Sequence, residues 1–569
     1  MAYIEKIFGA PGTGKTHNLV NRLQEHLDKN CPFDQTLTIS FTRVASRHIR
    51  QRISTKNQFT EKELMQNVRT IDSYLMNKIR EDKEICYWSE FIKEFYGVRT
   101  DKEINQDKKY EFYRGMDVID KGRITVGDGI ENILIYYDSL KGPAIGRRSV
   151  IRLFESYNNY KTNHFKMDWI DVKYKGLEDK VKFENNIILM VDEAQDCNRL
   201  EWLIINKLIA VSEYVFIAGD DDQAIYRFKG GEVETFLKLK VDKTTVLDES
   251  PRLNKDIWKL AQAAIHLIPP ERRQEKKYNP INENKYNMPQ CGLINSFRNK
   301  ESFERNSLNM EITDPAVPIH WLILARTNTI LDMKYSQEVY SWSQILAKNY
   351  FTWEIIDDSN GVSTGIERGT TPNVPADQIN AIETWRLLQK GERILGKNVR
   401  EFYKIIPANF IRNRKKTSLI SKDSIILNEG QYNYGDLNSK FYLDANINAP
   451  WSETLNLKPK NKDHYINYVK YLEKIFENGN YKKSEKILIS TIHGAKGLEA
   501  ANTILNCDWT YKPYETYCKG GVYRDDEIRI FYVGVTRTKY NLFLYQPEFS
   551  YGEYKGMKHN NFWNKIRGK

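Results

Sequence analysis

Three short groups of residues in this chain have the types and spacing needed for phosphate chemistry, and the first lies close to the N-terminus. Its sequence is Gly9-Ala10-Pro11-Gly12-Thr13-Gly14-Lys15-Thr16, which matches the pattern of a phosphate-binding loop. Glycines let backbone N–H groups approach phosphate oxygens, and a following helix adds a favourable dipole. We expect Lys15 to reach the β- and γ-phosphates of ATP and Thr16 to hold Mg²⁺. A glycine turn that arose by chance is the alternative interpretation.

The second group is a pair of adjacent carboxylates, Asp192 and Glu193, which follows the apolar run Ile187–Val191. If that run is a buried strand, both carboxylates lie at its C-terminal end. Asp192 can then order the Mg²⁺ shell while Glu193 polarises the attacking water. Taken alone, the pair is typical of a solvated acidic strand end. Beside a phosphate-binding loop, the pattern favours the catalytic interpretation.

The third group is the segment 219–231, whose sequence is Gly219-Asp220-Asp221-Asp222-Gln223-Ala224-Ile225-Tyr226-Arg227-Phe228-Lys229-Gly230-Gly231. A neutral side chain such as Gln223 can hydrogen-bond both a γ-phosphate and a water, which suits a sensor of nucleotide state. Tyr226 and Phe228 alternate with Arg227 and Lys229, and aromatic rings interleaved with cations form a stacking platform for single-stranded bases. Without the other two groups, this segment would be interpreted as an acidic turn and a core phenylalanine.

The elements that must position these groups are short apolar runs, each ending in small or polar residues. Near-continuous apolar runs indicate strands that are buried on both faces, as in parallel sheets covered by helices. Helical spacing appears between them, for example at Leu19, Leu23 and Leu27. The sequence therefore predicts an α/β fold with more than one parallel sheet. The predicted strands are Ile4–Phe8, Leu37–Phe41, Ile187–Val191, Val215–Ala218, Trp321–Ala325, Ile487–Ser490, Thr503–Leu505 and Leu542–Leu544.

Two stretches interrupt this alternation, residues 76–184 and residues 361–483. The first has a mainly helical texture, and the second contains the helix-like Ile379–Gln389 and the basic run Arg412–Lys416. Both are interpreted as insertions into α/β domains.

Length and composition limit the class of protein. The chain has 569 residues with 86 Lys+Arg against 75 Asp+Glu, a net charge of +11, and 40% hydrophobic residues. This composition fits several packed domains and permits a polyanionic partner. No run of 18 apolar residues and no secretory signal pattern occurs, and the six cysteines show no zinc spacing. We expect a soluble, cytoplasmic protein with reduced cysteines. The composition excludes secreted proteins, membrane proteins and zinc modules.

Together the motifs resemble the superfamily I DNA helicases of the UvrD/PcrA/Rep branch. The Asp-Glu-Ala-Gln-Asp element at 192–196 and the Gly-Asp-Asp-Asp-Gln-Ala-Ile-Tyr element at 219–226 are specific to that branch. Further segments resemble the family's motifs in the same order along the chain. They are 38–45 (Thr-Ile-Ser-Phe-Thr-Arg-Val-Ala), 68–73 (Val-Arg-Thr-Ile-Asp-Ser), 324–328 (Leu-Ala-Arg-Thr-Asn), 490–499 (Ser-Thr-Ile-His-Gly-Ala-Lys-Gly-Leu-Glu) and 526–537 (Asp-Glu-Ile-Arg-Ile-Phe-Tyr-Val-Gly-Val-Thr-Arg).

This resemblance implies two RecA-like P-loop domains, each with a mainly helical inserted subdomain. The first would comprise 1–75 and 185–245 with the insertion 76–184, and the second 246–360 and 484–569 with the insertion 361–483. ATP and Mg²⁺ would bind between them. The resemblance assigns γ-phosphate contacts to Arg252 and to Arg537, the family's arginine finger, and contacts near phosphate and ribose to Gly497 and Glu499. The DNA contacts that it implies are Phe41, Thr42, Thr70, Tyr226, Phe228, Lys229, Arg326, Asn328, Thr491 and His493.

The sequence departs from the family pattern at several positions. Eight residues precede Gly9, so we expect no upstream glutamine motif for reading adenine. Pro251 stands where relatives have a base-stacking tyrosine, Asp72 where they usually have histidine, and Ala500 where a bulky residue is common. Weak discrimination among nucleotides is therefore expected. Within residues 361–483, the run Arg412–Lys416 is interpreted either as a solvated face or as a contact to duplex phosphates.

The resemblance implies an ATP-dependent helicase or translocase that tracks 3′→5′ on single-stranded DNA and unwinds tailed duplexes. The opposite-polarity branch usually carries Gln-Leu-Pro-like residues after the glutamine, whereas Gln223 is followed by Ala-Ile-Tyr. Two alternatives stay open: a translocase that strips proteins from single strands, and an NTPase switch that acts with a nuclease or replication partner. A partner could bind through residues 361–483. Replication, repair, recombination, phage replication and anti-phage defence are all compatible settings, in a bacterium or a phage.

Overall fold

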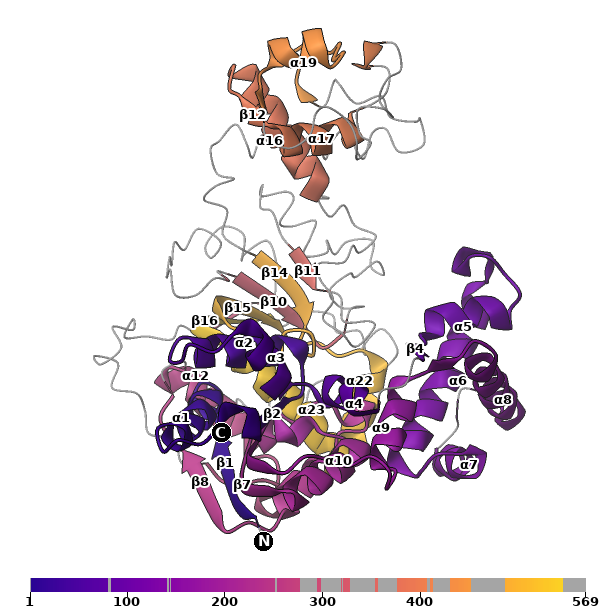
Figure 1. Ribbon diagram of the computed structural model, residues 1–569, viewed down its shortest axis with the longest axis vertical. Coiled ribbons are helices and arrows are strands. Elements are labelled where there is room, and N and C mark those ends of the chain that lie inside the picture. The colour runs from indigo at the N-terminus through magenta and orange to yellow at the C-terminus, as the bar shows by residue number, and fades with distance from the viewer. Residues whose placement is uncertain are drawn as a thin grey trace. The chain divides into compact units, whose positions relative to one another are not determined.

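The chain divides into two compact units, each built on a parallel sheet (Figure 1). Unit 1 comprises Met1–Cys291 and Glu515–Thr536, and unit 2 comprises Gly292–Tyr514 and Arg537–Gly568. The computed structural model describes residues 2–79, 83–140, 143, 145–250, 253–276, 294–297, 319, 321–327, 354–356, 376–406, 410–412, 430–451 and 487–545. The predicted α/β class with parallel sheets is confirmed. The limits of the four predicted domains stay a prediction.

Unit 1 contains a six-stranded sheet in which every pair of neighbouring strands is parallel. In sheet order its strands are β3 (Val68–Arg69), β2 (Thr36–Ser40), β6 (Asn186–Asp192), β7 (Ser212–Gly219), β1 (Tyr3–Gly9) and β8 (Lys243–Leu247). The strand that ends in the phosphate-binding loop thus lies beside the strand that ends at Gly219. The carboxyl ends of parallel strands meet at one edge, so the three chemical groups share this edge of the sheet.

Alternate residues of the central strands enter two separate cores. On β6, Ile188 and Met190 pack with α1 (Lys15–Leu27), α2 (Arg43–Ser54) and α3 (Glu61–Asn67) on one face. Leu189 and Val191 pack on the other face with α4 (Ile71–Ile79), α9 (Trp169–Leu177), α10 (Arg199–Ala210) and α11 (Val233–Lys238). Burial on both faces explains why the strand reads as a continuous apolar run.

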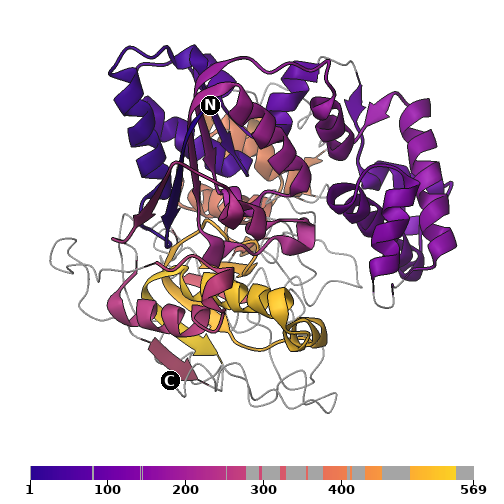
Figure 2. The same ribbon diagram turned by 90° about the horizontal axis from the view of Figure 1, so that it is seen from below.

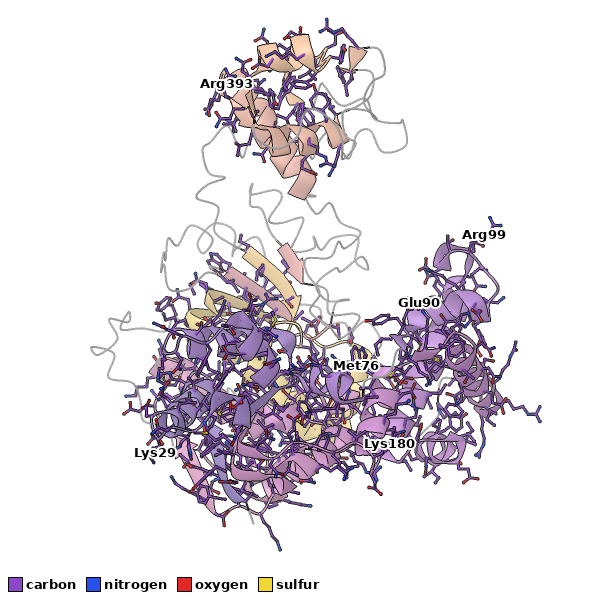
Figure 3. All side chains as sticks on the ribbon, viewed as in Figure 1. Lys29, Met76, Glu90, Arg99, Lys180 and Arg393 are labelled. Carbon is purple, nitrogen blue, oxygen red and sulfur yellow. The ribbon has the colours of Figure 1, made fainter. Side chains whose placement is uncertain are left out.

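A helical lobe separates β3 from β6 in the sequence. It consists of β4 (Glu84–Ile85), α5 (Trp88–Phe95), α6 (Gln106–Thr125), α7 (Ile130–Ser139), α8 (Arg147–Asn163) and β5 (Lys166–Met167). These helices enclose a core of their own, and β4 pairs with β5. Arg123 is buried there and pairs with Asp168 at 2.8 Å and with Asp171. Glu90 and Arg99 of this lobe are labelled in Figure 3. The helical texture predicted for this stretch is confirmed.

Two further helices complete unit 1, α12 (Lys255–Ile265) and α23 (Gly521–Val535). They pack against each other although about half the chain separates them in sequence, and Figure 2 shows the pair side by side. α23 also contacts the 3₁₀ turn η4 (Asp221–Gln223). Almost all of its second half is buried. α23 therefore brings a late part of the chain onto the third chemical group.

Unit 2 contains a second sheet whose six strands are again all parallel. Their order is β11 (Glu354–Ile356), β14 (Ile487–Thr491), β10 (Trp321–Ala325), β15 (Ala500–Asn506), β16 (Thr538–Tyr545) and β9 (Ile294–Phe297). α22 (Tyr511–Cys518) follows β15. Every residue of β10, β14 and β15 is buried, as expected for strands covered on both faces.

The described residues between 376 and 451 form a lobe with its own core. Its elements are α16 (Ala376–Gln389), α17 (Gly396–Ile405), α19 (Tyr434–Lys440) and the antiparallel pair β12 (Ile394–Leu395) and β13 (Gln431–Tyr432). Trp385, Phe402 and Trp451 pack together at the centre. Arg393, labelled in Figure 3, is exposed and pairs with Asp436. Of the predicted basic run 412–416, Arg412 is described and residues 413–416 lie outside the described residues.

All eight predicted strands fall within observed strands, apart from Phe41 at the end of one run. In the described part of the chain, no helix combines the length and the apolar character needed to cross a membrane.

Candidate nucleotide and nucleic-acid site

The phosphate-binding loop joins the end of β1 to the start of α1. Gly12 and Gly14 have φ values of +81° and +82°, a left-handed conformation that favours glycine. A Cβ atom on Gly9 would lie 2.2 Å from Thr13 Oγ1, so a side chain at that position would displace the loop. Thr13 closes the loop by donating its N–H and its hydroxyl to the Ala10 carbonyl, at 3.2 and 2.8 Å. The loop is thus a compact backbone cradle at the N-terminus of a helix.

Lys15 and Thr16 open α1 and point to different parts of this edge. Lys15 is buried, and its Nζ donates to the Gly9 carbonyl at 2.8 Å. The Thr16 hydroxyl donates to Asp192 Oδ2 at 2.8 Å, which joins the first chemical group to the second. Burial and the neighbouring Glu193 raise the pKa of Asp192 to about 6, although the Thr16 hydrogen bond opposes the rise. A divalent cation between these two oxygen ligands would stabilise the ionised carboxylate.

Glu193 stands just past the end of β6 in a left-handed conformation with φ +57°. Its backbone N–H donates to Asp192 Oδ1 at 3.0 Å, and its carboxylate accepts from Gln195 Nε2. Gln195 is buried and accepts on its Oε1 from the backbone N–H of Asp220 at 2.9 Å. One glutamine therefore connects the candidate general base with the third chemical group.

The third group begins with a buried acidic turn. Gln223 is buried, and its Nε2 donates to Asp220 Oδ2 at 2.6 Å. Lys276 Nζ lies 2.9 Å from Asp220 Oδ1, 2.7 Å from Asp221 Oδ1 and 2.7 Å from Asp222 Oδ2. We call Asp220–Asp222 with Lys276 and Arg273 the acidic clamp. Arg273 pairs with both oxygens of Asp222, at 3.1 and 2.9 Å.

Burial and charge act in opposite directions within the acidic clamp. Burial raises the pKa of Asp222, but Lys276 and Arg273 outweigh it and hold that pKa at about 2. For Asp221 burial prevails and the pKa is raised, although Lys276 opposes it. Burial lowers the pKa of Lys276, but the three carboxylates reverse this and raise it. Lys276 therefore stays charged, and it fixes the backbone on which Gln223 sits.

The second half of the same loop carries an aromatic surface. The ring of Tyr226 stacks on that of Phe41 with centroids 5.6 Å apart, and Phe228 lies 6.1 Å from Tyr226. Lys229 Nζ lies 4.9 Å from the Tyr226 centroid and 5.5 Å from that of Phe228. Phe228 is 49% exposed. We call Phe41, Tyr226, Phe228 and Lys229 the aromatic platform, and it suits the stacking of bases.

Arg227 does not join the aromatic platform, although the sequence places it between the two rings. Its side chain is 25% exposed and pairs with Asp526 on α23, Nε to Oδ2 at 2.9 Å, and with Glu234 on α11. Sequence alternation suggested two interleaved cations, and of these only Lys229 is seen over the rings.

Two other predicted DNA contacts of unit 1 stand at helix starts. Thr42 is exposed, and its hydroxyl caps α2 by accepting from the Ala45 N–H at 3.1 Å. Thr70 is half-buried and accepts from the Ser73 N–H at 3.3 Å. Asp72, which departs from the family's histidine, lies 2.6 Å from Lys173 Nζ.

In unit 2 the predicted residues gather at the carboxyl ends of β10 and β14. Thr491 pairs in register with Ala325, the residue before Arg326, and its hydroxyl accepts from the Gly494 N–H at 3.1 Å. His493 is buried two residues later. Gly497 has φ +86°, and Glu499 immediately precedes β15.

Arg537 is buried in unit 2, and its Nη1 donates to the Leu498 carbonyl at 3.2 Å. Arg252, Pro251 and Asn328 lie outside the described residues.

The acidic clamp and its link to α23 were not found from the sequence. Gln195 and Asp220 stood within recognised motifs without an assigned role. Arg273 and Lys276 lie some fifty positions after the carboxylates that they neutralise, and the available signal was the basic run 272–277.

Comparisons with known proteins find similarity to DNA helicases. Residues 5–120 and 138–244 match the model of the UvrD/REP helicase N-terminal domain. The chain is 21% identical over 599 residues to a probable DNA helicase II homolog of Mycoplasma genitalium, which covers 95% of this chain and 82% of the relative. It is 25% identical over 287 residues to the ATP-dependent DNA helicase Rep of Buchnera aphidicola subsp. Baizongia pistaciae, covering 46% of this chain and less than half, 40%, of that relative. The ATP-dependent DNA helicase Rep of Buchnera aphidicola subsp. Acyrthosiphon pisum is 21% identical over 596 residues, covering 95% of this chain and 92% of the relative.

Proposed function

We propose that the chain belongs to the UvrD/REP helicases, whose N-terminal domain model matches residues 5–120 and 138–244, and that it is an ATP-dependent DNA helicase that tracks 3′→5′ on single strands and unwinds tailed duplexes. The observation that carries the proposal is the loop 219–231. It holds Gln223, buried and connected through Asp220 and Gln195 to Glu193, and five positions later the half-exposed Phe228. A nucleotide sensor and a base-stacking surface on one short loop suit a motor that couples hydrolysis to movement.

The residues at the sheet edge fit ATP and Mg²⁺. The loop after Gly9 has no room for a side chain there and presents backbone N–H groups at a helix N-terminus, as a polyphosphate requires. Thr16 and Asp192 supply two hard oxygen ligands 2.8 Å apart, which is the donor set of a Mg²⁺ site. The hydrogen bond to the Gly9 carbonyl holds Lys15 Nζ close to the loop, where it could donate to phosphate oxygens. Bound Mg·ATP supplies the phosphoanhydride bond whose hydrolysis drives the motor.

The chain's own residues then have separate tasks. Glu193 holds a carboxylate past the strand end, where Gln195 orients it, so it can accept a proton from water. Gln223 can exchange its hydrogen bond with Asp220 for one with a γ-phosphate, which makes its position depend on the nucleotide. Arg252 and Arg537 are proposed as γ-phosphate contacts, and Gly497 and Glu499 as residues near phosphate and ribose.

The DNA path is proposed to follow the aromatic platform in unit 1 and the strand-end residues in unit 2. Tyr226 and Phe228 would stack on bases, with Lys229 near the backbone phosphates. Thr42 and Thr70 would donate or accept hydrogen bonds beside them. In unit 2, the contacts are proposed at Arg326, Asn328, Thr491 and His493. The 3′→5′ direction rests on the resemblance and on the Ala-Ile-Tyr sequence after Gln223.

The test is strand displacement with ATP on two duplexes, one with a 3′ single-stranded tail and one with a 5′ tail. Unwinding of the 3′-tailed duplex alone is expected, and Lys15→Ala should abolish it. Unwinding of the 5′-tailed duplex alone would refute the direction. No unwinding of either duplex, with DNA-stimulated hydrolysis intact, would favour a translocase or a switch that needs a nuclease or replication partner.

A further inference from the structure

In addition to the bridge between Gly231 and Asn198, ion pairs fasten the loop 219–231 at two places, and the second lies between Tyr226 and Phe228 of the aromatic platform. The first fastening is the acidic clamp, where Lys276 contacts Asp220, Asp221 and Asp222. The backbone N–H of Gln274 also donates to Asp221 Oδ2 at 2.8 Å. All of these carboxylates are inaccessible to solvent. The Gln223 end of the loop is therefore attached to the segment 270–276.

The second of these fastenings is made by Arg227. Its guanidinium reaches Asp526 on α23 through Nε and Glu234 on α11 through Nη2. Asp526 is 14% exposed and also lies 3.5 Å from Arg529 of the same helix. The carboxylates of Glu234 and Asp526 thus face the guanidinium groups of Arg227 and Arg529, so the local charge is balanced. A planar guanidinium with donors in several fixed directions suits a residue that joins two elements at once.

The two fastenings meet on α23. Arg272, in the segment 270–276, pairs with Asp525 through Nε to Oδ2 at 2.6 Å and Nη2 to Oδ1 at 3.1 Å. Arg529 donates Nη2 to the Arg272 carbonyl at 3.1 Å. The adjacent residues Asp525 and Asp526 thus hold both the segment that carries Lys276 and the loop that carries the aromatic platform. These contacts join the segment next to Gln223 to the segment between Tyr226 and Phe228 through one helix.

We propose that Arg227 is a positioning residue that couples the nucleotide site to the aromatic platform by fixing the loop against Asp526. The inference rests on the proposed function. Arg227 contacts neither nucleotide nor DNA in this scheme, because its guanidinium pairs with Glu234 on α11 and with Asp526 on α23. Replacing Arg227 does not alter the side chains of the aromatic platform, Phe41, Tyr226, Phe228 and Lys229. The replacement removes the Arg227–Asp526 contact, which in this proposal couples the position of the aromatic platform to the position of Gln223.

The experiment measures ATP hydrolysis by the full chain with and without a saturating single-stranded oligothymidylate. In Arg227→Gln and in Asp526→Asn, DNA-free hydrolysis should stay within about twofold of the unsubstituted protein. The stimulation by DNA should fall about tenfold, within the usual range of coupling between two sites. Arg227→Lys keeps the charge and should recover part of the stimulation. The double variant should be no worse than either single variant, because both remove the same contact.

Arg147→Gln is the matched control, since Arg147 forms an exposed ion pair with Asp138 in the helical lobe. It should leave stimulation unchanged. A merely structural role for Arg227 would lower DNA-free and DNA-stimulated hydrolysis in proportion, and this result would overturn the inference. So would equal stimulation in Arg227→Gln and Arg147→Gln. If Arg227→Gln fails to fold, the near-isosteric Asp526→Asn carries the test. An unsubstituted protein that DNA does not stimulate would count against the proposed function instead.

Discussion

Replacing Lys276 with methionine should destabilise unit 1 far more than replacing an exposed lysine does. Lys276 Nζ lies within 2.9 Å of one oxygen of each carboxylate in the acidic clamp, and its side chain is 1% exposed. Arg273 is the other cation of the clamp, and it pairs with Asp222. Methionine has a similar length and no charge. The substitution therefore leaves the packing nearly unchanged and removes the neutralisation of Asp220 and Asp221.

The magnitude follows from the charges that are left unpaired. The acidic clamp holds three carboxylates and two cations, a net charge of −1, and the substitution changes this to −2. Removing one partner of a buried ion pair costs about 3–5 kcal/mol of folding free energy. Protonation of Asp221 limits this cost in folding free energy. Burial already raises the pKa of Asp221, and a protonated Asp221 needs no cation.

The cost should also depend on pH. Burial raises the pKa of Asp221, and Lys276 opposes the rise. Removing Lys276 should raise this pKa further, so the variant should lose stability as pH rises through the folded-state pKa. The destabilisation should thus be smaller in mildly acidic buffer than at neutral pH.

Native-state hydrogen exchange of the peptide 212–219 gives the free energy of opening for unit 1, because β7 is central to its sheet. The control is Lys259→Met on α12, where the lysine is 65% exposed and pairs with Asp256 at 3.2 Å. Exposed pairs contribute little. If Lys276→Met lowers the free energy of opening by no more than Lys259→Met does, the acidic clamp does not stabilise unit 1 and the reasoning fails.

Two further predictions concern the reaction. Glu193→Gln should lower ATP hydrolysis at least about 100-fold by removing the proton acceptor, while titration with a fluorescent nucleotide shows binding preserved; near-normal hydrolysis would contradict the mechanism. Burial raises the pKa of Asp526 to about 6 against the opposing effect of Arg227 and Arg529, with Glu234 nearby. Because Asp526 is charged only above that pH, DNA stimulation, taken as a ratio to DNA-free hydrolysis, should be present above pH 6 and decline below it. Asp526→Asn should show no such decline.

The strands were predictable where they are buried on both faces. β6, β10 and β14 appear in the sequence as largely apolar runs because almost all of their residues are buried. The edge strand β8 was not predicted, since Lys243–Leu247 alternates between exposed and half-buried residues. β3 is two residues long and gives no periodic signal. Strand position in the sheet thus decided which strands the sequence revealed.

Candidate site residues could be assigned from the sequence where the expected chemistry is local in sequence. Thr16 and Asp192 were each assigned from their own motif, and their 2.8 Å contact agrees with a shared ligand. The partners of the carboxylates 220–222 could not be assigned in this way. Which of 86 basic residues neutralises them depends on the packing of the segment 270–276 and α23 against the loop, and that packing has no signature in local spacing. Arg227 shows the same limit, because its alternation with Tyr226 and Phe228 suggested a place in the stacking platform, whereas the structure pairs it with Asp526.

Buried charge in unit 1 is concentrated where elements distant in sequence meet. Lys173 of α9 lies 2.6 Å from Asp72 of α4 and 3.5 Å from Glu201 of α10, so Asp72 shares a cation with Glu201. Lys276 and Arg227 make the same kind of junction for the loop 219–231. Buried ion pairs add little net stability compared with apolar packing, but leaving one unpaired is costly. Such pairs therefore act mainly by making conformations that separate the two charges unfavourable. For the loop 219–231, that penalty would keep the proposed nucleotide sensor Gln223 and the proposed DNA contacts Tyr226 and Phe228 in a fixed relation to each other.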